Sequence, residues 1–311
     1  MLPACKECNV GTMTRLADLC GYDADTEAAL VSMARSVTDS YPTDDDFSRN
    51  CENEGDIWGR LEPIIGTDDP YAKMKREYND LTLSMEGTLV ERIRSAASPA
   101  QTALRYAAVG NLIDFGPSEG FTPDDLVALI DSAPSLDFVV DDSAELLERA
   151  ARARTLTYVA DNCGEIAFDK VLIRELTREN PSLRVTYVVR RLPILNDNTM
   201  VDADHARMDE VARVIDNGDA HHAAGSVMGF ASEEFRRALA DADVVIAKGQ
   251  GNLETLAGNG RADIFFMFMA KCALLAQGCG VEMRSLVCSH GSPNGFATRR
   301  PAGAEEKGHL S

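Results

Sequence analysis

The sequence predicts an α/β protein in which an amino-terminal helical domain, residues 1–152, precedes a three-layer α/β/α core with a mainly parallel sheet, residues 153–288. Up to Arg152, apolar residues recur at intervals of three and four, as on one face of a helix. After Arg154, β-branched and aromatic runs alternate with helical runs, which implies parallel strands covered by helices on both faces. The 311 residues, 45% of them hydrophobic, can bury a substantial core.

The helical periodicity of the first domain is clear at Leu81, Met85 and Leu89. Prolines such as Pro99 fall between the apolar runs and separate the helices. We expect the only tryptophan, Trp58, in the core of this domain.

The first strand is predicted over residues 155–159, and it stops at Asp161 and Asn162. Gly164 permits a tight turn into a helix over residues 165–179. Ligands of open α/β sheets bind at this carboxyl edge, and two adjacent oxygen donors suit a hard cation such as Mg²⁺ or Mn²⁺. The same Asp-Asn pair could equally be a helix cap that needs no metal.

The second strand, residues 184–189, leads to Asn196 and Asp197, just before a helix predicted over residues 199–215. Neighbouring parallel strands would bring their carboxyl ends within about 5 to 10 Å of each other. Asp197 can then join Asp161 and Asn162 around one ion, leaving coordination positions for water and substrate.

A helix over residues 232–240 and a third strand, residues 243–247, come next. This strand ends at Lys248, and the glycine-rich turn that begins at Gly249 leads into a helix. A lysine beside exposed backbone N–H groups forms an anion site in outline, although the order of residues is not that of a Walker A loop. Strands over residues 264–269 and 284–288 complete the sheet, and residues 289–311 read as a disordered tail.

The net charge of −19 excludes the basic surface that a nucleic-acid-binding protein needs. No apolar run reaches the length of about 18 residues that marks a membrane span. The amino terminus lacks the pattern of a signal peptide, so we expect a cytoplasmic protein without a membrane partner. No pattern in the sequence specifies the oligomeric state.

The eight cysteines are too irregularly spaced for a disulfide framework, so free thiols are expected. The Cys5-x-x-Cys8 pair could form a structural metal site with Cys20 and Cys51, although a second close pair is missing. Adjacent His221 and His222 point in different directions and are expected to be solvated.

Several motifs together resemble the damage-control phosphatases, the family also known as domain of unknown function 89. The similarity runs from Cys5 to about Cys288, and the short form with a Cys-x-x-Cys pair resembles its prokaryotic subfamily. The motifs that carry it are Cys5-x-x-Cys8, Asp69-Pro-Tyr71-x-x-x-Lys75-x-x-x-Asn79, Gly110-Asn111-Leu-Ile-Asp114, Asp161-Asn-Cys-Gly-Glu-Ile-Ala-Phe-Asp169, Asn196-Asp197 and Lys248-Gly-Gln-Gly-Asn-Leu-Glu-Thr255.

The resemblance implies a metal-dependent phosphomonoesterase, a hydrolase of small phosphorylated metabolites such as sugar or nucleotide phosphates, damaged ones included. It places Asp161, Asn162 and Asp197 on the ligands of a divalent ion, which would be Mg²⁺, Mn²⁺, Co²⁺ or Ni²⁺. It places the phosphate-binding lysine at Lys248, beside the Gly249 turn. It also implies that three more residues contribute to the pocket: Asn111, Asp114 and the further basic residue Lys271.

The roles of four residues stay open at this point. Asp161 can be a metal ligand or a nucleophile, because strand-end aspartates serve both purposes in α/β phosphatases. Glu165 can be a general base, a residue that supports the ligands from behind, or an acid that favours the helix dipole. Arg190 and Arg191 can contact an anionic substrate or pair with nearby acids.

Two other classes of protein remain alternatives. A cofactor-binding α/β enzyme would carry a glycine-rich fingerprint after the first strand, and the Asp-Asn-Cys-Gly turn has one glycine. A non-catalytic metal-binding module could use the same ligands without turnover.

Overall fold

A computed structural model describes residues 1–44, 46–111, 122–258 and 261–296. Its centre is a seven-stranded sheet in the order β1-β7-β6-β5-β2-β3-β4. All neighbouring strands are parallel except β6 and β7, which are antiparallel. The strands are β1 (Val140–Asp141), β2 (Thr155–Val159), β3 (Arg184–Val189), β4 (Arg213–Asp216), β5 (Val244–Lys248), β6 (Ile264–Met269) and β7 (Leu286–His290).

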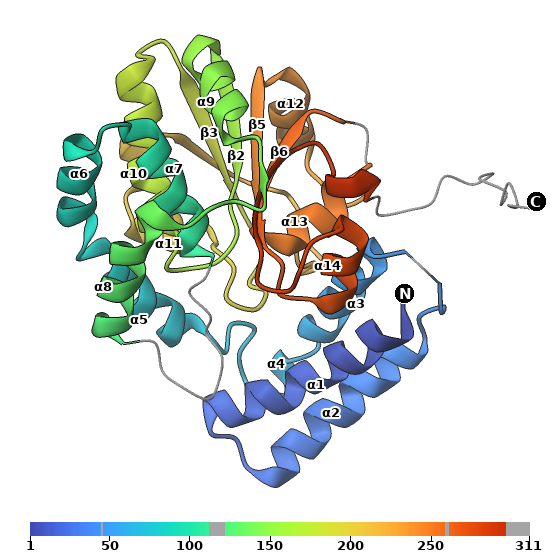
Figure 1. The fold of residues 1–311 in the computed structure, drawn as a ribbon. Helices are drawn as coiled ribbons and strands as arrows, with labels where there is room; N and C mark the ends of the chain where they lie inside the picture. Colours follow the sequence, from blue (N-terminus) through green and yellow to red (C-terminus); the bar gives the residue numbers. More distant parts are fainter. Residues whose placement is uncertain (45, 112–121, 259–260, 297–311) are drawn as a thin grey trace, which may run out of the picture.

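Helices surround this sheet (Figure 1). The α-helices are α1 (Pro3–Cys20), α2 (Ala24–Asp39), α3 (Ser48–Trp58), α4 (Glu62–Ile65), α5 (Ala72–Leu83), α6 (Glu86–Ser95), α7 (Pro99–Gly110), α8 (Pro123–Ser132), α9 (Ser143–Arg152), α10 (Ile166–Glu179), α11 (Met200–His205), α12 (Glu233–Asp241), α13 (Gly249–Leu256) and α14 (Ala273–Cys279). Short 3₁₀ turns are η1 (Ala133–Ser135), η2 (Met208–Glu210) and η3 (Pro293–Gly295).

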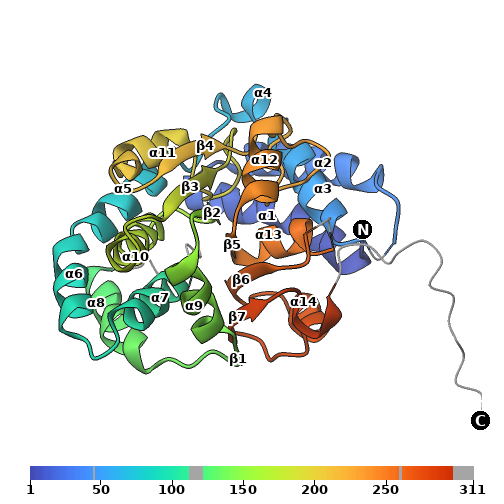
Figure 2. The same cartoon turned by 90° about the horizontal axis from the view of Figure 1, so that it is seen from above.

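The two faces of the sheet carry separate apolar cores, because side chains alternate between the faces along each strand. Tyr158 and Ile246 face the core that is covered by helices α6 to α10. Val159 and Val245 face the core beneath α12, α13 and α14. Figure 2 shows the sheet between these two groups of helices, so the predicted three-layer α/β/α architecture is confirmed.

A third core lies among α1, α2, α3 and the residues that follow them, and it includes Trp58, which is fully buried as predicted. Ile194 and Ala224, from loops that follow β3 and β4, complete this core. The first helices therefore pack against loops at the carboxyl edge of the sheet (Figure 1). No helix among the described residues is long and apolar enough to cross a membrane.

Strand and helix positions largely follow the sequence prediction. The strands predicted at 155–159, 184–189 and 264–269 have the predicted bounds, and those predicted at 243–247 and 284–288 are shifted to 244–248 and 286–290. The helix predicted over residues 199–215 is wrong in its second half. It ends at His205, and residues 213–216 form the edge strand β4.

The first core extends across the domain boundary that the sequence predicts at residue 152. Leu146 of α9 and Leu104 of α7 share this core with the strands, and β1 joins the sheet. At the other end of the chain, Ser289 and His290 end β7, and Phe296 packs edge-on against Phe47 at 5.0 Å. Residues 289–296 therefore belong to the folded core, and residues 297–311 lie outside the described residues.

Candidate active site

The loops that follow β2 and β3 are joined side by side at the carboxyl edge of the sheet. The N–H of Asn198 donates to the carbonyl of Asp161 at 2.8 Å, and the N–H of Cys163 donates to the carbonyl of Asn196 at 2.7 Å. The side chain of Asn198 adds a bond to the carbonyl of Asn162 at 2.7 Å. These bonds bring together the two motifs that the sequence placed on neighbouring strands.

Asp161, Asn162 and Asp197 lie together in the floor of a cavity of about 770 Å³. The cavity opens between the carboxyl edge of the sheet and the helices α1 and α3, which contribute residues such as Asn9 and Glu54 to its wall. Lys271, which follows β6, lines the same cavity. The predicted ligand set and one of the predicted basic residues therefore meet in one place.

Burial and mutual repulsion perturb the acid at the centre of the site. Asp161 is 8% exposed and Asp197 is 5% exposed. Burial raises the pKa of Asp161 well above its ordinary value, and the charges of Asp197 and Glu165 raise it further, while Arg190 and Lys271 oppose the rise. A carboxyl pair of this kind is stabilised by a cation placed between its members.

The oxygen atoms of the site fit a hard divalent cation. Oδ2 of Asp161 accepts hydrogen bonds from the side-chain amides of Asn111 at 3.0 Å and Asn162 at 2.8 Å. Within the described parts of the chain, no hydrogen bond reaches Oδ1 of Asp161, Oδ1 of Asp197 or the amide oxygen of Asn162. Carboxylate and amide oxygens are ligands that Mg²⁺ and Mn²⁺ prefer, and three of them leave coordination positions for water and substrate.

Glu165 supports this site from behind. It is fully buried, so it is not the solvent-facing acid of a first helical turn. Its Oε1 accepts hydrogen bonds from Asn111 at 2.7 Å and from Asn162 at 2.9 Å. Because Glu165 occupies the amide nitrogen of Asn162, the amide oxygen is left for a ligand. Glu165 is not among the residues that line the cavity.

Lys248, for which the family resemblance implies phosphate binding, lies beneath the cavity floor. Its ammonium group is fully buried and bonds to Glu165 at 2.6 Å, Asp169 at 3.1 Å and the carbonyl of Ala107 at 2.8 Å. Burial alone would lower the pKa of Lys248, but Asp169 and Glu165 outweigh it and raise it. The ammonium group donates to three acceptors beneath the cavity floor and so holds Glu165 in place, and Lys248 is not among the residues that line the cavity.

Asp169 completes the buried network beneath the floor. Its carboxylate accepts hydrogen bonds from Tyr158 at 2.5 Å and from Tyr187 at 2.9 Å, besides the bond from Lys248. Asp169 ends the Asp161 motif in the sequence but has no role assigned there, although it lies four residues after Glu165 and therefore on the same helical face.

Gly249 and Asn111 lie next to Asp161. Gly249 has φ +77°, and a β-carbon there would stand 2.0 Å from Oδ2 of Asp161, so only glycine fits. Asn111 caps α7, bonds to Asp161 and accepts the N–H of Met269 at 3.1 Å. Asp114, predicted in the same motif, lies outside the described residues.

The motif from Asp69 to Asn79 supports the site loops from outside. Oδ1 of Asn79 accepts the N–H of Gly164 at 2.7 Å, which fixes the turn after Asn162. Lys75 pairs with Asp69 at 2.7 Å and with Asp202, the acid of the capping box of α11, at 3.6 Å. Of this motif, Tyr71 lines the cavity.

All eight cysteines are free, as expected. Cys5, Cys8, Cys51 and Cys272 line the cavity, whereas Cys20 bonds to the carbonyl of Pro70. In the described ranges, no group of three or more His, Cys, Asp or Glu side chains is arranged to hold a metal ion, and Cys20 does not line the cavity with the other three cysteines of the site considered above. The candidate ion site differs from such a group because it combines two acids with an amide.

The chain is similar to proteins of one family. A family model described as the damage-control phosphatase ARMT1-like domain matches residues 1–287. A damage-control phosphatase of Pyrococcus horikoshii is 33% identical over 232 residues, which cover 75% of this chain and 78% of the relative. A damage-control phosphatase of Archaeoglobus fulgidus is 30% identical over 287 residues, which cover 92% and 97%.

The fold is shared with a solved structure. The crystal structure of a DUF89 family protein from Pyrococcus horikoshii matches it with a TM-score of 0.82 and 29% sequence identity, over 94% of this chain and 99% of that one.

Proposed function

The chain belongs to the damage-control phosphatase ARMT1-like family, and on that premise we propose that its cavity hydrolyses phosphate monoesters of small metabolites with one divalent metal ion. The observation that carries the proposal is the meeting of Asp161, Asn162 and Asp197 with Lys271 in one cavity. A cavity of about 770 Å³ is of the size that encloses a small molecule.

The charge balance beneath the cavity supports a single ion. Four buried carboxylates, those of Asp161, Glu165, Asp169 and Asp197, face two buried cations, Arg190 and Lys248. With all six ionised, two negative charges are in excess, which one divalent ion offsets. Such an ion, when bound, neutralises charge on the transferring phosphoryl group and lowers the pKa of a coordinated water.

The protein's own groups have separate tasks. Asp161, Asn162 and Asp197 hold the ion through the oxygens that carry no internal hydrogen bond. Lys271 lines the cavity and forms no ion pair within 4.0 Å with the described residues, so its ammonium group is available to bind the dianionic phosphate. Asn111 and Glu165 keep the ligands oriented, and Asp161 acts in this proposal as a ligand.

The opposite wall of the cavity receives the rest of the substrate. Asn9, Glu54, Tyr71 and Glu254 present hydrogen-bonding groups there. These groups suit hydroxyl-bearing metabolites such as sugar or nucleotide phosphates, which fits the small phosphorylated substrates that the family name suggests. The amides and acids on this wall do not form the basic surface that nucleic acid requires.

The test is phosphate release by EDTA-treated protein from p-nitrophenyl phosphate, sugar phosphates and nucleotides, with Mg²⁺, Mn²⁺, Co²⁺ or Ni²⁺ added back singly. We expect no release without metal and restored release with at least one ion. Release that EDTA does not reduce would contradict the metal requirement. Thermal stabilisation by Mn²⁺ without release of any phosphate would instead identify a non-catalytic metal-binding module.

A further inference from the structure

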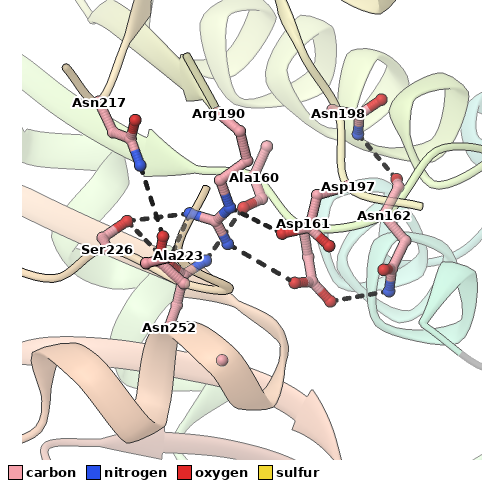
Figure 3. Close-up of polar contacts among 12 residues, drawn as sticks. Ala160, Asp161, Asn162, Arg190, Asp197, Asn198, Asn217, Ala223, Ser226 and Asn252 are labelled. Carbon is pink, nitrogen blue, oxygen red and sulfur yellow. Dashed lines mark hydrogen bonds and ion pairs between the residues drawn. The ribbon is translucent and has the colours of Figure 1, made fainter. Parts of the chain in front are cut away.

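Arg190 is a buried cation beside both candidate metal-binding carboxylates. It follows β3 directly, and its side chain is 3% exposed. Its backbone is tied to the loop that carries Asp197, because the N–H of Arg190 donates to the carbonyl of Asn198 at 2.8 Å. Figure 3 shows the guanidinium group between Asp161 and Asp197 on one side and Ser226 and Asn252 on the other.

Three of the guanidinium contacts fix its plane. Nε donates to Oδ2 of Asp197 at 2.7 Å. Nη1 donates to Oγ of Ser226 at 3.0 Å and to Oδ1 of Asn252 at 3.1 Å. Asn252 is held in turn, because its amide nitrogen donates to the carbonyls of Ala160 at 3.0 Å and Lys248 at 2.7 Å. The guanidinium therefore links the loops after β3 and β4 to α13, and through Asn252 to the loop after β2.

The third guanidinium nitrogen, Nη2, is directed at the other carboxylate. Nη2 is buried without a hydrogen-bond partner among the described residues, and it lies 3.9 Å from Oδ1 of Asp161. Arg190 thus bonds to one oxygen of Asp197 and approaches an oxygen of Asp161 that is itself free of hydrogen bonds from the described chain. A buried guanidinium nitrogen without a hydrogen-bond partner destabilises the folded protein, so we expect its charge to have a function in the site.

A cation shared by two carboxylates does part of what a second metal ion does in two-metal phosphatases, which clamp the reacting group between two positive charges. Unlike a metal ion, a guanidinium group cannot be removed by a chelator, and its N–H donors are held in a fixed planar arrangement. It also repels a divalent ion bound to the same carboxylates.

We propose that Arg190 is a positioning residue that serves as the permanent second cation of this site: it aligns Asp197 and Asp161 and lowers their affinity for the divalent ion. The effect on turnover rests on the function proposed above. The effects on ion binding and on the stability of the metal-free protein do not.

The experiment compares Arg190→Met, Arg190→Gln and Arg190→Lys with the wild type. Mn²⁺ binding is measured by isothermal titration calorimetry, and unfolding of the EDTA-treated proteins is followed by circular dichroism. The matched controls are Arg191→Met and Arg191→Lys, because Arg191 is adjacent in sequence and has an exposed side chain. Arg190→Gln makes the same comparison as the methionine variant should the latter not fold.

We expect the neutral variants to bind Mn²⁺ about tenfold more tightly, because a positive charge close to the ion is removed. We expect their kcat to fall about 10- to 100-fold, because Asp197 loses the partner that orients it. Their melting temperature without metal should fall, and the rise on adding Mn²⁺ should exceed that of the wild type. Arg190→Lys should keep the wild-type affinity for Mn²⁺ but have a lower kcat, because lysine keeps the positive charge and lacks the planar set of N–H donors.

A merely structural role predicts a different pattern, in which Mn²⁺ binding and kcat both weaken. That result, or an unchanged Mn²⁺ affinity in the neutral variants, would overturn the proposal. Tighter Mn²⁺ binding in Arg190→Met would support it even if the wild type released no phosphate, in which case only the proposed function would fail.

Discussion

Gly249 and Asp161 touch so closely that the site depends on the absence of a side chain. Gly249 has φ +77°, and a β-carbon added there would stand 2.0 Å from Oδ2 and 2.1 Å from the carboxyl carbon of Asp161. The start of α13 therefore packs directly on the candidate metal ligand. Because the clash is with the carboxyl group itself, Asp161 would have to move.

Gly249→Ala should therefore reduce phosphatase activity by about 100-fold or more, since small displacements of a reacting group have effects of that size. It should also cost about 1–3 kcal/mol of stability, from strain at positive φ. Steady-state kinetics and urea unfolding measure both. Gly87→Ala is the matched control, because a β-carbon there meets nothing within 4 Å. Wild-type activity in Gly249→Ala would contradict the placement of Asp161.

Lys248 and Lys271 should behave differently on replacement by methionine. Lys248→Met leaves Glu165 and Asp169 as buried unpaired acids and should destabilise the protein by about 3–5 kcal/mol. Lys271→Met should change stability by about 0.5 kcal/mol or less, since Lys271 has no ion pair among the described residues. Urea unfolding measures both effects.

Kinetics separates the same two lysines. Lys271→Met should raise KM about tenfold or more, because a charge-assisted bond to phosphate is removed. Lys248 does not line the cavity, so we expect its replacement to change stability and not KM. A stable Lys248→Met protein with a raised KM would restore Lys248 as the phosphate-binding residue.

Glu254 should make the stability of the metal-free protein fall as pH rises. It is 8% exposed, and burial raises its pKa from 4.5 to about 7, although bonds from Asn50 and Cys51 oppose the rise. The folded state therefore holds a proton between pH 4.5 and 7 that the unfolded state has lost, so stability decreases through this window. The shift corresponds to about 3 kcal/mol.

Glu254→Gln should remove this part of the pH dependence. Denaturant unfolding at pH 5 and pH 8, in EDTA, should show a smaller difference for the variant than for the wild type. Glu91→Gln changes the net charge equally at an exposed position on α6 and should keep the wild-type difference. Equal pH dependence in wild type and Glu254→Gln would show that Glu254 is not the buried acid responsible.

The sequence predicted the buried strands well because their apolar runs are long and bounded by turn residues. The edges of the sheet were missed, since β1 has two residues and β4 has four, of which one is buried. Such short, half-exposed strands carry too few apolar residues to show a period of two. The helix predicted over residues 199–215 therefore runs into β4.

That Asp161, Asn162 and Asp197 lie together could be predicted, because strand ends mark them in the sequence. The roles of Lys248 and Arg190 could not, because each depends on acids brought close by folding. Lys248 follows its strand as an anion-binding lysine would, yet Glu165 and Asp169 take up its charge. Arg190 stands beside exposed Arg191, and only the path of the loop after β3 decides which of the two is buried.

The most direct test of the central claim is metal-dependent phosphate release by Asp161→Asn and Asp197→Asn, with Asp204→Asn as a matched control at an exposed position on α11. All three variants remove one negative charge with almost no change of shape. The account predicts that release in the presence of Mn²⁺ is lost in the first two and kept in the control. Release at the wild-type rate by either site variant would contradict the assignment of this cavity as the active site.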